Sequence, residues 1–527
     1  MKRRSFIKNV AAGVALPSLL GGFGVRLHAT APLGRLMSAL DADNDRALVL
    51  IQLDGGNDGL ATLSPLDQYD RLKKARPNIA LPENRLLPLT GLSTLAMHPA
   101  FIGMRNLYEE GQVRIVQNAG YPNPNLSHFR ATDIWMSASH ADEFIGSGWA
   151  GRYLAYEYPN FPIGYPNANM PHPLAVEIGY SMSLSLMGPQ TGMGFVIPDT
   201  QSYYQLLAGE QAPAPNTPAG EQLAYVRLIA QQSRVFAQAI LDASKKATNQ
   251  ATYPDTPLAA KLKIIARLIA GGLKSRFYLA SIGGFDTHAQ QADTSDPTKG
   301  AHAQLLQQLG DAVWAFCQDI QALGVADRVA GMTFSEFGRR VASNFSDGTD
   351  HGEAAPLFLF GTPVAGGVTG SNPKLPLNPT LNDNLPMEVD FRSVYATVLR
   401  DWFCVPEADV PSILMHQHPF VNGLFRPGMA CLTSSVREDH WEAGRSLLTC
   451  RPNPFREAVV LDYESTGGPT VVQILDASGR IVATPVSGWQ AQGRYQITWD
   501  GSALPAGVYF CRLVSGQAQQ TRTLQKH

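Results

Sequence analysis

The chain has 527 residues, which is more than one ordinary domain contains and enough for a large buried core with an appended module. Its formal net charge is -2, so nothing in the composition suggests a nucleic-acid-binding surface, and we expect no nucleic-acid partner. Only 16% of the residues are charged, whereas glycine (48) and proline (37) are plentiful. This composition excludes a disordered chain and favours a loop-rich, well-packed exported protein.

The N-terminal segment has the pattern of an export signal. Arg3-Arg4 precedes a modest apolar stretch, Val10–Val25, and small residues around Ala29 could form a cleavage site. This pattern resembles a twin-arginine signal, which implies that residues 1–31 are a cleaved signal peptide and that the twin-arginine translocase is a partner. A membrane anchor is the alternative, but the stretch is short and is interrupted by glycine and proline.

Apolar runs alternate with helical patterns over residues 43–430, and this alternation predicts one α/β domain. The predicted strands are buried apolar runs: Ala47–Leu53, Val113–Gln117, Leu174–Ile178, Phe277–Ile282, Val329–Phe334 and Pro356–Phe360. The predicted helices are Phe129–Ala138, Ala219–Lys246, Leu258–Leu268, His302–Leu323 and Arg392–Trp402. Ligands of open α/β sheets bind at the carboxyl ends of the strands, so the residues that follow these runs are candidates for a site.

Acidic and histidine residues occupy those positions. Asp54 follows the first predicted strand, and Asp286 and His288 follow the fourth. Glu336 follows the fifth strand, and His351 precedes the sixth. Carboxylates gathered at one edge repel each other unless a cation balances them, and histidine is a matching nitrogen ligand. The sequence therefore predicts a divalent metal site, whether for zinc, calcium, magnesium or manganese.

Each of these residues also has a plainer interpretation. Asp54 could belong only to a turn, and Asp286 could cap one. His288 could be a polar residue with ordinary hydrogen-bond partners. Glu336 could form a simple ion pair with Arg339, worth about 0 to 1 kcal/mol at a surface.

Two further polar residues have open roles. Asp58 could bind a second metal ion or shape the loop after the first strand. His302 opens a predicted helix, where it could support a ligand or cap the helix.

The five cysteines do not have the spacing of a cysteine-based zinc site, because no pair is arranged as CxxC. Cys317 and Cys404 lie in or beside apolar helical patterns, and we predict that both are inert core residues. Cys431 and Cys450 flank a connecting segment, residues 431–450, and could form a disulfide outside the cytoplasm.

The last 77 residues, 451–527, form short alternating runs divided by turns, and this pattern predicts a small β-sandwich. The sequence strings are Pro452-Asn453-Pro454-Phe455, Asp476-Ala477-Ser478-Gly479-Arg480 and Trp499-Asp500-Gly501. They resemble the type A sorting domain of the type IX secretion system. This resemblance implies the type IX machinery as a partner and export through the periplasm to the cell surface or the medium. A carbohydrate-binding or spacer module is the alternative.

A second resemblance covers nearly the whole main domain. The motifs that carry it are Gln52-Leu53-Asp54-Gly55-Gly56-Asn57-Asp58, Ser127-His128-Phe129, Gly283-Gly284-Phe285-Asp286-Thr287-His288, Ser335-Glu336-Phe337-Gly338-Arg339 and Gly348-Thr349-Asp350-His351-Gly352. Their order resembles the bacterial family labelled domain of unknown function 1501, which looks like a distant branch of the alkaline phosphatase and sulfatase superfamily. The resemblance implies an alkaline-phosphatase-like sandwich with a largely parallel central sheet.

The superfamily resemblance also implies roles. It matches Asp54, Asp286, His288, Glu336 and His351 to metal ligands and places Ser127 where the nucleophile stands. Ser127 could equally be the N-cap of the following helix. Arg339 or Arg130 could stabilise developing negative charge. The sequence contains no Cys-x-Pro-Ser-Arg motif, so a formylglycine sulfatase is disfavoured.

Two functions follow from these observations. The first is an exported, metal-dependent hydrolase of phosphate or sulfate esters, with a polysaccharide ester among the expected substrates. The second is a non-catalytic binding or assembly protein of the cell surface that keeps the fold.

Overall fold

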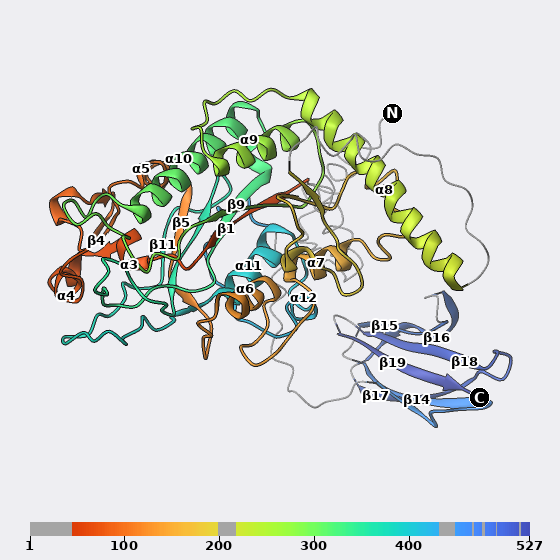
Figure 1. The fold of residues 1–527 in the computed structure, drawn as a ribbon. Helices are drawn as coiled ribbons and strands as arrows, with labels where there is room; N and C mark the ends of the chain where they lie inside the picture. Colours follow the sequence, from red (N-terminus) through yellow and green to blue (C-terminus); the bar gives the residue numbers. More distant parts are fainter. Residues whose placement is uncertain are drawn as a thin grey trace, which may run out of the picture. The chain divides into compact units, whose positions relative to one another are not determined.

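The structure is a computed structural model that describes residues 45–198, 218–431, 448–465, 468–476, 480–491, 493–515 and 518–527 (Figure 1). The predicted signal peptide, residues 1–31, lies outside the described residues. The chain divides into two compact units between Ser434 and Ser435. Within the described ranges, no helix is both long enough and apolar enough to cross a bilayer.

The first unit is built on one nine-stranded sheet of order β11-β5-β10-β9-β1-β8-β6-β7, with β12 also paired to β5. Its strands are β1 (Ala47–Asp54), β5 (Val113–Gly120), β6 (Ala175–Ile178), β7 (Phe195–Ile197), β8 (Phe277–Gly283), β9 (Val329–Phe334), β10 (Ala355–Phe360), β11 (Gly367–Thr369) and β12 (Val389–Asp390). Only β10 runs antiparallel to its neighbours. The predicted largely parallel α/β fold is confirmed.

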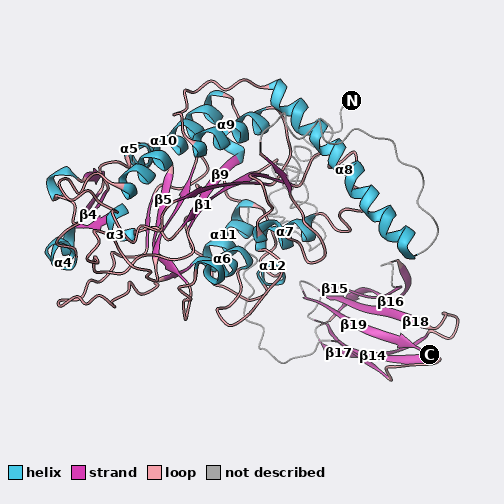
Figure 2. Ribbon diagram, viewed as in Figure 1, coloured by secondary structure: helices cyan, strands magenta, loops and turns pink. Residues whose placement is uncertain are grey.

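Helices cover both faces of this sheet (Figure 2). Val49 and Ile51 of β1 pack in one core with α5 (Ile102–Glu109), α9 (Pro257–Ala270) and α10 (Ala301–Ala322). Leu48 and Leu50 pack in the other core with the helices of the opposite face. Those helices are α6 (His128–Ser137), α7 (Trp149–Glu157), α11 (Phe391–Thr397) and α12 (Val410–Leu414). Burial on both faces explains why the strands appear in the sequence as continuous apolar runs.

Several elements complete the unit without having been predicted. A three-stranded antiparallel sheet of order β2-β4-β3 consists of β2 (Leu63–Pro65), β3 (Leu87–Leu89) and β4 (Leu92–Met97). Further unpredicted helices are α3 (Gly59–Thr62) and α4 (Tyr69–Ala75), whereas the predicted helix Ala219–Lys246 is α8 (Pro218–Lys246). The helix predicted over Arg392–Trp402 is α-helical only to Thr397 and continues as a π-helix over Val398–Trp402.

The disulfide expectation was wrong. Cys431 is bonded to Cys404, not to Cys450, and Cys404 is therefore not an inert core residue. The strand that contains Cys450 belongs to the second unit, where Cys450 packs against that unit's core. The sequence spacing of Cys431 and Cys450 did not reveal this, since the true partner depends on how the chain returns after α11.

The second unit contains two antiparallel sheets of orders β13-β14-β17 and β16-β15-β18-β19. Their strands are β13 (Leu448–Arg451), β14 (Ala458–Ser465), β15 (Gly468–Asp476), β16 (Ile481–Gln490), β17 (Gly493–Asp500), β18 (Gly507–Ser515) and β19 (Ala518–Lys526). Alternate residues of both sheets, such as Leu461 and Leu513, share one buried core. The predicted all-β C-terminal sandwich is confirmed.

Candidate metal centre

The loops that follow β1 and β8 approach each other closely. Gly55, directly after β1, has a φ of +123°, a conformation that L side chains rarely adopt. A Cβ atom on Gly55 would lie 2.2 Å from the backbone nitrogen of Asp286. Glycine at this position therefore allows the end of β1 to approach the loop that carries Asp286.

Arg339 connects the same loops. Its side chain is fully buried, and its Nη2 lies 2.7 Å from Asp286 Oδ1. The other acceptors of its guanidinium are backbone oxygens: those of Gly55, Gly56 at 2.9 Å, Phe285 at 3.0 Å and Thr349 at 2.9 Å. Arg339 thus joins the loops after β1 and β8 to the loop before β10.

Three side chains that the sequence predicted as ligands converge beside Arg339. Asp286 Oδ1 lies 3.1 Å from His288 Nε2 and 3.2 Å from His351 Nε2. The two Nε2 atoms are 2.9 Å apart. Residues from the loop after β8 and from the segment before β10 therefore meet at one point, as the strand topology predicts.

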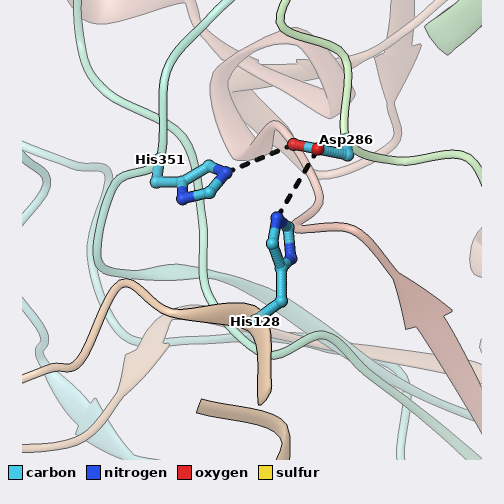
Figure 3. Close-up of side chains that lie close together, drawn as sticks. All are labelled: His128, Asp286 and His351. Atoms are coloured by element: carbon cyan, nitrogen blue, oxygen red, sulfur yellow. Dashed lines mark hydrogen bonds and ion pairs between the residues drawn. The ribbon is translucent and has the colours of Figure 1, made fainter. Parts of the chain in front are cut away.

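A fourth side chain, His128, reaches the same carboxylate from the start of α6 (Figure 3). Its Nε2 lies 3.5 Å from Asp286 Oδ2. Ligand atoms of His128, Asp286 and His351 all lie within 4.8 Å of one another. The sequence placed His128 only beside Ser127; its position before a helix, in a histidine-containing motif, was the available indication.

The outer nitrogen of each histidine has an acceptor of its own. His351 Nδ1 lies 2.9 Å from the backbone oxygen of Leu126. His288 Nδ1 lies 3.2 Å from Asp350 Oδ1, and His128 Nδ1 lies 2.9 Å from Glu336 Oε1. A neutral imidazole that donates through Nδ1 has an unprotonated Nε2.

With these tautomers, the unprotonated Nε2 atoms of His128, His288 and His351 all lie within 3.5 Å of the Asp286 carboxylate oxygens. Such a group of acceptors is stabilised by a cation between them. Histidine ligands whose other nitrogen donates to a carboxylate or a carbonyl are typical of zinc sites. The donor set therefore fits a divalent ion.

The pKa shifts are consistent with this arrangement. Burial alone would raise the pKa of Asp286, but the hydrogen bond and charge of Arg339 outweigh it, and the net pKa is lowered. Burial lowers the pKa of His351, which favours its neutral form. Burial raises the pKa of Glu336, although the hydrogen bond with His128 acts in the opposite direction.

The other two predicted carboxylate ligands lie beside the cluster. Glu336 is 1% exposed, and its Oε1 accepts a hydrogen bond from the backbone nitrogen of Gly55 at 2.8 Å. It therefore contacts His128 instead of Asp286. Asp54 is exposed at the end of β1, close enough for its charge to act on Glu336. Within the described part of the chain, Asp54 forms no ion pair.

Ser127 is the N-cap residue of α6, but its side chain makes no capping hydrogen bond and is exposed. Arg130 does not face the cluster, because its Nη2 is hydrogen-bonded to the Ser139 hydroxyl and to the backbone oxygens of His140, Ala141 and Glu143.

Asp58 and His302 belong to a separate buried network. Asp58 Oδ2 pairs with Arg76 at 2.6 Å, while its Oδ1 accepts from the Ala61 nitrogen and caps α3. Asp58 therefore shapes the loop after β1. His302 Nε2 lies 3.2 Å from the Thr62 hydroxyl, and its Nδ1 has no partner among the described residues.

Comparison with family models finds one match in each part of the chain. Residues 180–408 match the family described as Protein of unknown function (DUF1501), and residues 451–527 match the Secretion system C-terminal sorting domain. Both resemblances seen in the motifs are confirmed. No curated protein matches the sequence.

Solved structures similar to the chain include sulfatases. One is the PsFucS1 sulfatase from Pseudoalteromonas sp., with a TM-score of 0.33, 12% identity, and coverage of 89% of this chain and 88% of that one. Another is described with the metabolism of multiple glycosaminoglycans by Bacteroides thetaiotaomicron, with a TM-score of 0.34, 9% identity, and coverage of 91% and 89%. At these TM-scores the likeness is distant.

Proposed function

We propose that this chain, which carries a DUF1501 region and a secretion sorting domain, is an exported hydrolase of phosphate or sulfate esters that depends on a divalent metal ion. The sorting domain indicates secretion or attachment to the cell surface. The observation that carries the enzymatic part is the convergence of the His288 and His351 Nε2 atoms on Asp286 Oδ1.

Asp286, His288 and His351 would hold the ion. His128, whose Nε2 lies near Asp286 Oδ2, would be a further ligand. A set dominated by imidazole nitrogen favours zinc over calcium or magnesium, which prefer oxygen ligands. A bound divalent ion would polarise the ester oxygens and lower the pKa of a water molecule. Asp54, which is exposed at the end of β1, remains a proposed ligand.

The chain's own residues would prepare this chemistry. Glu336 orients His128, Asp350 orients His288 and the Leu126 carbonyl orients His351, so each imidazole presents Nε2. Arg339 would act through Asp286 and the loops, because its side chain is buried and engaged with backbone oxygens.

Ser127 is the proposed nucleophile, with water as the alternative. Its hydroxyl is exposed, free of the capping role, and adjacent to His128. It stands at the N-terminus of α6, where backbone N–H groups favour an anionic ester group.

The competing function is a binding or assembly protein without catalysis, and one observation favours it. The Arg339 guanidinium lies on the same oxygen, Asp286 Oδ1, that the two histidines approach. If one of the two histidines is protonated, then Arg339, Asp286 and the histidines form a metal-free network of ordinary hydrogen bonds.

Metal analysis of the purified mature protein separates the two functions. We expect stoichiometric zinc, lost in Asp286→Ala and retained in Asp293→Ala, a change at an exposed acid with no contact to the cluster. Hydrolysis of phosphate esters, sulfate esters and sulfated polysaccharide should then require Asp286. A metal-free protein with no activity above that of Asp286→Ala would leave the non-catalytic function.

A further inference from the structure

Two cysteines of the C-terminal unit lie on opposite sheets of its sandwich. Cys450 is on β13, in the three-stranded sheet, and Cys511 is on β18, in the four-stranded sheet. Cys511 is fully buried in the core that both sheets share, and the half-buried Cys450 packs against that core. The structure records both as free thiols.

A hydrogen bond between the sheets joins β13 to β19, the strand that neighbours the one carrying Cys511. Cys511 is paired in register with Arg522 of β19. The Nε atom of Arg522 donates to the backbone oxygen of Leu448 at 3.0 Å, two residues before Cys450. The β13 strand therefore lies beside the edge strand β19, next to the position on β18 that Cys511 occupies, and both cysteines face the same core.

The two thiols differ in exposure and in pKa. Contact with Cys511 lowers the pKa of Cys450 despite partial burial, and the charge of Arg522 lowers it further. Contact with Cys450 and burial both raise the pKa of Cys511. Cys450 is thus the more exposed and the more readily ionised thiol, the properties of an attacking cysteine, and Cys511 is placed to resolve it.

We propose that Cys450 and Cys511 form a disulfide that joins the two sheets of the C-terminal sandwich once the protein is outside the cytoplasm. The oxidant is a disulfide, such as that of a thiol oxidase. The Cys450 thiolate attacks one oxidant sulfur, forming a mixed disulfide, and the other oxidant sulfur leaves and takes up a proton. The Cys511 sulfur loses its proton and attacks the Cys450 sulfur, which releases the second oxidant thiol. Two protein thiols become one disulfide, and one oxidant disulfide becomes two thiols.

The test uses the full chain, reduced and then exposed to oxidised glutathione. Peptide mapping without reduction should find Cys450 linked to Cys511. The Cys404–Cys431 link in the same map is the internal reference, and Cys317→Ser is the matched control that should leave the map unchanged. In Cys511→Ala, Cys450 should retain glutathione, because the resolving thiol is gone.

Two outcomes would overturn the proposal. One is alkylation of both Cys450 and Cys511 when the oxidised wild-type protein is unfolded and labelled. The other is glutathione that stays on Cys450 in the wild type. Both outcomes are read on the unchanged sequence, so a variant that fails to fold does not affect them.

Discussion

The Nδ1 atom of His128 lies 2.9 Å from Glu336 Oε1, and this contact joins the start of α6 to the end of β9. The same oxygen accepts a hydrogen bond from Gly55, so one buried carboxyl group connects three segments of the chain. Glu336 thereby determines which nitrogen of His128 faces Asp286.

Glu336→Gln should separate stability from metal binding. The pKa of Glu336 is raised by burial above its ordinary 4.5. A raised pKa favours the folded state when the group is protonated, so this contribution is present below pH 4.5 and is lost as the pH rises through the folded pKa. In urea unfolding with chelator, wild type should lose stability relative to Glu336→Gln as the pH rises to neutrality.

The same variant should bind zinc about 10- to 100-fold more weakly, because a neutral amide replaces the carboxylate that contacts the outer nitrogen of the metal-bound imidazole. Calorimetric titration at neutral pH measures this. Unchanged affinity would show that His128 is not a ligand.

Asp350→Asn tests the orientation of His288. Asp350 Oδ1 lies 3.2 Å from His288 Nδ1. Loss of the carboxylate should weaken zinc binding by about 10-fold with little change in the unfolding midpoint. Asp347→Asn is the matched control, since Asp347 belongs to the same loop but bonds Asn78. Equal effects of the two changes would contradict the assigned tautomer.

Gly55→Ala should damage the site much more than an equivalent change elsewhere. The added Cβ would lie 2.2 Å from backbone nitrogen in a positive-φ conformation. We expect a loss of more than about 3 kcal/mol of unfolding free energy. Gly91→Ala is the control, because Gly91 also has positive φ but no atom within 4 Å, and it should cost only about 1 kcal/mol.

His302 should make the protein sensitive to acid. Burial lowers its pKa from 6.5 to about 4. A lowered pKa means that the contribution to stability is complete above pH 6.5 and is lost as the pH falls toward about 4. Relative to neutral pH, this loss reaches about 2 kcal/mol at pH 5. His302→Gln should reduce that loss in urea unfolding, whereas a change at the exposed His527 should not.

Removal of the Cys404–Cys431 disulfide should destabilise the first unit. The bond closes a segment with a sequence separation of 27, for which chain entropy predicts about 3.5 kcal/mol. Cys404→Ala with Cys431→Ala should lower the thermal midpoint of this unit. Cys317→Ala, a change at a free buried thiol, removes core packing but no cross-link. Reductant should lower the thermal midpoint of the Cys317→Ala variant by no more than it lowers that of the wild type.

The regular elements were predictable because burial leaves a direct record in the sequence. The predicted Phe277–Ile282 and Val329–Phe334 correspond to β8 and β9 within one residue, since strands covered on both faces must be continuously apolar. The small sheet β2-β4-β3 was missed because its three strands have no such run. The change from α-helix to π-helix at Val398 has no signature in the apolar pattern.

The site was predictable in part. Strand ends correctly placed Asp286, His288 and His351 together, because topology alone brings them to one edge. Sequence position could not show that Glu336 contacts His128 or that Arg339 lies beneath the loops, since both depend on side-chain direction. The Cys404–Cys431 pair depends likewise on the path of the chain around Trp402.

Because the buried guanidinium of Arg339 already bonds the loops that carry Asp286 and precede β10, the candidate ligands are gathered in the folded protein without an ion. The conformational entropy lost in bringing these loops together is part of the free energy of folding, so binding of an ion would not have to order them. The affinity for a divalent ion would then depend on coordination chemistry and not on ordering of the chain, and the metal-free protein would keep the same arrangement of ligands.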